Sequence, residues 1–129
     1  MVRAALEGIA YTVAAHVDII EREHGLPIER IMLVGGGTKN PAWMQAIADV
    51  CGRAVSVAKV TMGACFGDAL MAALAGGAYD GWDELGEQLG VAQTIEPDRE
   101  VYELYARRRH IFDDLYTRNR DLMHELALP

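Results

Sequence analysis

The 129-residue sequence has little of what marks a specialised class of protein. Its two cysteines, Cys51 and Cys65, make neither a disulfide framework nor a C-x-x-C site. Twelve basic against 19 acidic residues leave a net charge of −7, so no general basic field favours nucleic acid. The sequence also lacks an apolar run that could span a bilayer and an N-terminal signal peptide. We therefore expect a cytoplasmic protein with buried free thiols and with no nucleic-acid or membrane partner.

What is present indicates one globular unit. Hydrophobic residues make up 51% of the chain and charged residues 24%, which suits a folded domain with a single core. Apolar residues at helical spacing predict a first helix from residue 3 or 4 to Gly25; they are Leu6, Ile9, Val13, Val17 and Ile20. Because no capping residue precedes this helix, we expect the chain to begin inside a larger unit.

The most informative stretch is the apolar run 31–34, followed by Gly35, Gly36 and Gly37 and by a second helix. Asn40 suits the N-cap of that helix, and Pro41 suits its first position, where a missing N–H is harmless. A strand, a glycine turn and a helix N-terminus together form a common binding place for phosphate or nucleotide. A tight βα turn, whose glycines only satisfy steric needs, is the alternative.

The following residues extend this unit. The second helix is predicted to end at Gly52, and residues 54–57 read as a second strand, so that strand, helix and strand form a right-handed βαβ unit. The continuous apolar run 31–34 predicts a central, buried, parallel strand. A loop over 59–63 leads to a small-sided helix over 64–75. Gly67 lies inside that helix, and we expect close packing against a sheet or a ligand to offset its low helix propensity.

The C-terminal third is predicted to hold a short helix over 82–89, an extended segment over 91–95 and a long helix over 98–129. An apolar seam runs along the long helix, with Arg109 and Asn119 as polar interruptions; its members are Tyr102, Tyr105, Phe112, Tyr116, Met123 and Leu126. The interruptions favour packing on the domain or on a neighbour over a strict coiled coil. The basic run 107–110 is read as a solvated helix face.

Two common nucleotide motifs do not fit the glycine stretch. Lys39 lacks the spacing of the P-loop, G-x-x-x-x-G-K-[ST]. The dinucleotide pattern G-x-G-x-x-G begins at Gly35 but has Asn40 in place of its third glycine. The acidic residue expected about 20 positions later is absent too. A Rossmann-type cofactor domain is therefore a weaker alternative.

A third pattern fits. The stretch 34–45, VGGGTKNPAWMQ, with ADV at 48–50 and Gly52, resembles the C-terminal domain of the FGGY carbohydrate kinases. Further parts of that domain are matched in the same order. They are the stretches 3–11, 67–73 and 95–97, the last together with the tyrosines that follow it. The resemblance implies an α/β fold: a partial ribonuclease-H-like domain of the actin/hexokinase-like ATPase type, with a short, mostly parallel sheet flanked by helices. It also implies Mg²⁺-ATP as the phosphoryl donor and a sugar or polyol as the acceptor.

Carried over residue by residue, the resemblance places Gly35, Gly36, Gly37 and Asn40 in an adenosine-binding loop. Gly36 is expected to let its backbone approach the nucleotide, Asn40 to hydrogen-bond the adenine side, and Gly35 and Gly37 to shape the turn. We assign no residue as the catalytic base or as a metal ligand, because that family's sugar domain and phosphate-gripping segments have no counterpart here. Residues 1–129 therefore read as a single partial domain, inactive alone and prone to homo-oligomerise through exposed apolar surface. A non-catalytic nucleotide-binding or assembly module stays open.

Overall fold

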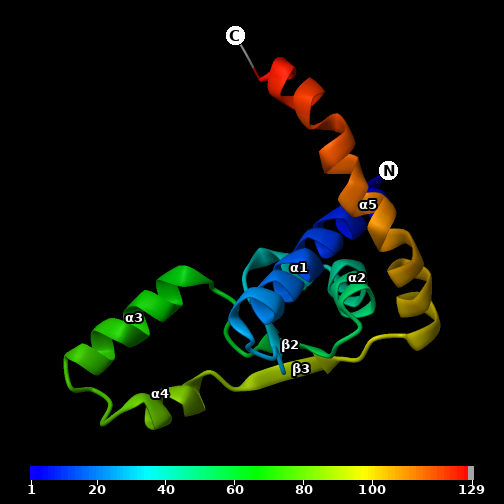
Figure 1. Cartoon of the computed structure of the whole chain (residues 1–129). Coiled ribbons are helices and arrows are strands. Elements are labelled where there is room, and N and C mark those ends of the chain that lie inside the picture. Colours follow the sequence, from blue (N-terminus) through cyan, green and yellow to red (C-terminus); the bar gives the residue numbers. More distant parts are fainter. Residues whose placement is uncertain (128–129) are drawn as a thin grey trace.

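The computed structural model describes residues 1–127 and shows an α/β arrangement with a long C-terminal helix (Figure 1). The helices are α1 (Val2–His24), α2 (Pro41–Cys51), α3 (Ala64–Ala75), α4 (Trp82–Gln88) and α5 (Arg99–Leu126). The strands are β1 (Ile31–Leu33), β2 (Val55–Ala58) and β3 (Val91–Ile95), and a one-turn 3-10 helix, η1 (Gly36–Lys39), joins β1 to α2. The predicted helix over 98–129 corresponds to α5, and residues 128–129 lie outside the described part.

Local signals explain where the first two helices stop and where α2 starts. Asn40 caps α2, because its side-chain oxygen accepts the Trp43 N–H at 3.2 Å, and Pro41 occupies the first helical position. Gly52 ends α2 with φ at 64°, and Gly25 ends α1 with φ at 62°. The bounds predicted for α2 are confirmed.

The sheet differs from the prediction in which strand is central. Its order is β1-β2-β3, with β1 parallel to β2 and β3 antiparallel to β2, so one of its two pairings is parallel. All four residues of β2 are buried, whereas β1 lies at an edge with Met32 36% exposed. The expectation of a central, buried strand at 31–34 is therefore wrong. An apolar run indicates that the side chains of a strand are buried against other elements. It carries no information about how many strands flank that strand.

The core lies between one face of the sheet and the helices α1, α2 and the first half of α5. It is formed by Ala10, Tyr11, Ala14, Ala46, Ile47, Ala48, Val50, Val55 and Tyr105. The Tyr11 ring stacks on Phe112 at 4.9 Å and meets Tyr105 edge-on at 5.8 Å, which joins α1 to α5. The first half of the predicted seam thus packs on the domain, while Tyr116 and Met123 are exposed.

The segment containing α3 and α4 is much less buried, and Figure 1 shows it extending away from α1 and α2. Leu70 is the one buried residue of α3, and a Cβ added at Gly67 would meet no atom within 4 Å. Close packing of Gly67 against the sheet is therefore wrong, whereas its contact with a ligand stays a prediction. The expectation of two buried thiols also holds only in part, because Cys51 is half-buried but Cys65 is exposed. Within residues 1–127 there is no helix that is both long and apolar enough to cross a membrane.

Candidate functional site

The three glycines after β1 are required for different reasons. Gly35 has φ at 87°, the left-handed region that favours glycine, and its N–H donates to the Thr61 carbonyl at 3.1 Å. A Cβ at Gly37 would overlap the six-membered ring of Trp43, so this position needs glycine for packing. Gly36 has neither constraint: its φ is not positive, and a Cβ there would meet nothing within 4 Å. Gly36 is exposed, so the space above its backbone is open.

Hydrogen bonds inside the turn hold this backbone in place. The Thr38 hydroxyl donates to the Gly35 carbonyl at 2.7 Å, and the Asn40 N–H donates to the Gly37 carbonyl at 3.0 Å. The Asn40 side-chain oxygen caps α2, while its amide nitrogen makes no hydrogen bond within residues 1–127. Asn40 is exposed, so this nitrogen can donate to a ligand. Thr38, which was assigned no contact from the sequence, stabilises the turn; a hydroxyl three residues after Gly35 is the signal for it.

A cavity of about 510 Å³ lies between the first turns of α1 and α2 and the start of α5. Asn40 contributes to its wall, but the three glycines do not. Its other lining residues are Val2, Arg3, Leu6, Glu7, Ala42, Gln45, Ala46, Asp49 and Tyr105. The volume falls within the range of about 300 to 1,000 Å³ that is usual for small-molecule pockets.

One wall of this cavity is a polar cluster on α1 and α5. The Glu7 carboxylate accepts bonds of 2.7 Å from the Arg3 guanidinium and from the Tyr105 hydroxyl. The hydrogen bond from Arg3 is the main cause that lowers the pKa of Glu7, and burial raises the pKa of Tyr105. Glu7 therefore stays ionised and faces the cavity as a hydrogen-bond acceptor. The i,i+4 spacing of Arg3 and Glu7 is visible in the sequence, but their contacts with Tyr105 are not, because Tyr105 lies 98 or more residues away on α5.

The opposite wall includes Asp49, whose role is structural. Its Oδ1 atom accepts a bond of 2.8 Å from the Gln45 side chain and one of 2.8 Å from the Asp98 backbone N–H. Gln45 also donates to the Glu96 carbonyl at 3.0 Å. These bonds fix the turn that leads into α5. Asp49 is therefore occupied in holding these segments together.

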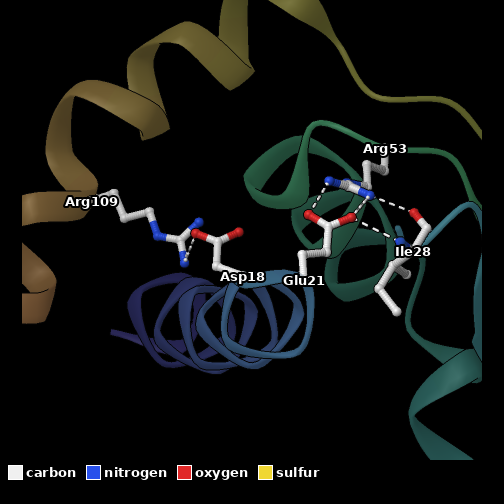
Figure 2. A network of polar contacts seen from close by, with 5 residues as sticks. All are labelled: Asp18, Glu21, Ile28, Arg53 and Arg109. Carbon is white, nitrogen blue, oxygen red and sulfur yellow. Dashed lines mark hydrogen bonds and ion pairs between the residues drawn. The ribbon is translucent and has the colours of Figure 1, made fainter. Parts of the chain in front are cut away.

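A second polar cluster fastens the segment before β1. Arg53 and Glu21 form a pair with two bonds of 2.8 Å, and the Ile28 N–H donates to the same carboxylate at 2.8 Å (Figure 2). The same view shows Asp18 of α1 paired with Arg109 of α5 at 2.9 Å. The hydrogen bond from Arg53 is the main cause that lowers the pKa of Glu21, with the Ile28 N–H second. Neither pair was predictable from the sequence, because side chains 32 or 91 positions apart leave no periodic signal.

Among residues 1–127, no group of three or more histidine, cysteine or acidic side chains gathers as a metal ion requires. The described residues therefore offer no donor set for Mg²⁺.

The fold and this loop define the class of protein. Xylulose kinase from Rhodospirillum rubrum superposes with a TM-score of 0.75 at 31% identity, over 92% of this chain and 24% of that one. The ADP-bound glycerol kinase of Plasmodium falciparum shares the fold, with a TM-score of 0.71 at 24% identity, over 88% of this chain and 23% of that one. The chain has the fold of part of a sugar kinase of the actin/hexokinase-like ATPase type.

The family follows from the sequence. Residues 1–76 match the profile of the FGGY family of carbohydrate kinases, C-terminal domain, and the chain belongs to that family. The xylulose kinase of Escherichia coli is 32% identical over 124 residues, which are 95% of this chain and 25% of that protein. The xylulose kinase of Bacillus subtilis is 28% identical over 93% of this chain and 24% of that protein. The chain thus spans about a quarter of the length of these curated relatives, and the predicted relationship to carbohydrate kinases is confirmed.

Proposed function

We propose that this chain supplies the adenosine-side contacts of an ATP-dependent carbohydrate kinase. The observation that carries the proposal is Gly36. Neither backbone conformation nor packing within the fold requires a glycine there, yet the position is open, exposed and flanked by two glycines that the fold does require. Close approach of a ligand to the backbone is the remaining reason to omit a side chain. Asn40, with its exposed amide nitrogen beside the cavity, adds a hydrogen-bond donor for the adenine side.

ATP fits the residues present through its adenosine end only. When bound, ATP supplies the phosphoryl group, and in the whole kinase a sugar or polyol hydroxyl accepts it. Transfer depends on positioning and on neutralising charge at the γ-phosphate, usually with Mg²⁺. The role of this chain is to hold the adenosine end through the Gly36 backbone and Asn40, on a turn kept rigid by Thr38 and Trp43. The sugar site and the base belong to other parts of such a kinase, and xylulose is the first acceptor to test.

The proposal is tested by titrating the chain with ADP and ATP in a calorimeter. We expect measurable binding, and we expect Gly36→Ala to weaken it about tenfold or more, because a methyl group would fill the approach to the backbone. Gly67→Ala is the matched control: its Cβ also meets no atom, but it lies on α3, outside the stretch 35–40. Equal affinities of the Gly36→Ala and wild-type chains would rule out the proposed contact.

The isolated chain is expected to be inactive as a kinase. Incubation with Mg²⁺-ATP and a panel of xylulose, ribulose, glycerol and hexoses should yield no sugar phosphate. Turnover that persists through stringent purification and is abolished by Gly36→Ala would contradict this expectation. Tight nucleotide binding that is unaffected by the remainder of a kinase would instead favour a non-catalytic nucleotide-binding module.

Exposed apolar side chains support the proposal that the chain self-associates. Ile9, Val34, Met62 and Met71 are each about half exposed or more, although most such residues in a folded domain are covered. Sedimentation over a range of concentrations measures this directly, and a monomer at the highest concentration would contradict it. The cytoplasmic location expected from the cysteine content likewise stays a prediction.

A further inference from the structure

We propose that Glu21 and Arg53 are positioning residues for the glycine loop, because they fix the register of β1 against β2 at the amino ends of both strands. This inference rests on the proposed role of the loop in holding nucleotide. Their side-chain hydrogen bonds go to each other and to Ile28, and none that the described residues make reaches the loop. Their effect is transmitted through β1, which connects their contacts to Gly35.

The geometry is a three-way junction, shown in Figure 2. Arg53 donates from its two terminal nitrogens to the two oxygens of Glu21, at 2.8 Å each, and it also donates to the Ile28 carbonyl. The Ile28 N–H donates to Glu21 at 2.8 Å. Both backbone polar groups of Ile28 are therefore held by one ion pair. A planar guanidinium can make such a set of bonds at once, whereas an ammonium group holds a single point.

The junction lies at the amino ends of the two parallel strands. Ile28 lies three residues before β1, and Arg53 lies two residues before β2, whose first pairing is Ile31 with Val55. The junction thus ties together the two chain segments that enter the parallel pair. At the other end of the strands, the Gly35 N–H bond to the Thr61 carbonyl ties together the segments that leave it.

β1 needs these end contacts more than an ordinary strand does. It has three residues and, within residues 1–127, one neighbouring strand, so few ladder bonds resist sliding. A slip by one residue would turn Ile31 and Leu33 away from the core and bring Met32 toward it. Such a slip would also displace Gly36, which follows β1 by three residues. The side chains of Arg53 and Glu21 are 34% and 27% exposed, so the pair is partly shielded from water.

The experiment compares Glu21→Gln with Glu23→Gln in the full chain. Both remove a carboxylate from the last turns of α1, but among the described residues Glu23 pairs only with its exposed neighbour Arg22. Amide hydrogen exchange is measured at Gly35, Thr38 and Asn40 in the loop and at Ile47 and Val50 in α2. We expect Glu21→Gln to speed exchange in the loop about tenfold, with α2 within about twofold of wild type, since one lost charge-assisted bond is worth about that factor. Glu23→Gln should change neither.

Arg53→Lys separates geometry from charge. If the junction positions the loop, the rise in loop exchange in Arg53→Lys is more than half of the rise in Glu21→Gln, although Arg53→Lys keeps the positive charge. Unchanged loop exchange in Glu21→Gln overturns the inference. A rise that is equal in the loop and in α2 also overturns it, because it shows general destabilisation.

A titration with ADP links the junction to the site. If the wild-type chain binds ADP, Glu21→Gln should weaken binding about tenfold and Glu23→Gln should not; unchanged affinity in Glu21→Gln overturns the inference. If the wild-type chain binds no ADP, the proposed function of the loop fails, and the exchange data alone still decide whether the junction positions it.

Discussion

Two helices of similar composition, α2 and α3, have opposite surroundings. Each carries a single charged residue, Asp49 in α2 and Asp68 in α3. In α2 six of 11 residues are buried, because α1, α5 and the sheet contact it on several sides. In α3 only Leu70 of 12 is buried. Apolar composition therefore shows how much surface a helix offers for burial, and the burial itself depends on which neighbours the chain places beside it.

The largest test of this comparison removes one large side chain from each helix. Ile47 is fully buried in α2, whereas Met71 of α3 is 52% exposed. We expect Ile47→Ala to lower the free energy of unfolding by about 2–5 kcal/mol, through lost burial and the cavity left behind. Met71→Ala should change it by about 0.5 kcal/mol or less. Urea denaturation of the two variants measures both values, and similar losses would show that α3 is packed in solution.

A smaller difference is expected between two glycines. Gly37→Ala should destabilise the chain by roughly 1–3 kcal/mol, because the new methyl group overlaps the Trp43 ring. Gly67→Ala should stabilise it by roughly 0.5–1 kcal/mol, because alanine favours the helix and the added Cβ meets nothing. Thermal unfolding of both variants checks the opposite signs. A stabilising Gly37→Ala would mean that Trp43 leaves the loop in solution.

The smallest effect expected is a pH dependence confined to the packed region. The pKa values of Glu21 and Glu7 are lowered in the folded chain, mainly by hydrogen bonds from Arg53 and Arg3. Their stabilisation is therefore fully present above about pH 4.3, the usual pKa of glutamate, and is lost as the pH falls through the lowered folded values. The urea midpoints of wild type and Glu21→Gln should differ at pH 7 and converge in acid. A difference that widens in acid would contradict the assignment.

The sequence was informative wherever one residue acts on its own neighbours. Asn40, Pro41 and Gly52 determine the ends of α2 through local capping, and the bounds predicted from them are confirmed. The helix over 64–75 and the extended segment over 91–95 were also predicted with the observed bounds. The 3-10 turn η1 was not predicted, because three glycines permit many backbone paths.

Features that depend on distant parts of the chain were not predictable. The edge position of β1 follows from the antiparallel arrival of β3 on the far side of β2, which no pattern in residues 31–34 encodes. The same holds for the pairing of Glu21 with Arg53. For the site, the resemblance gave the positions of the glycines, but the separate reasons for Gly35, Gly36 and Gly37 became visible only with Trp43 and Thr61 in place.

The contact between Gly37 and Trp43 has an optical consequence. The indole of Trp43 rests on the backbone of the loop, while Trp82, on α4, is 62% exposed. These are the two tryptophans of the chain, so its fluorescence has a shielded and a solvated component. Iodide should quench the solvated emission of Trp82 first. In a Trp82→Phe variant, the remaining spectrum reports on the glycine turn directly, without any label.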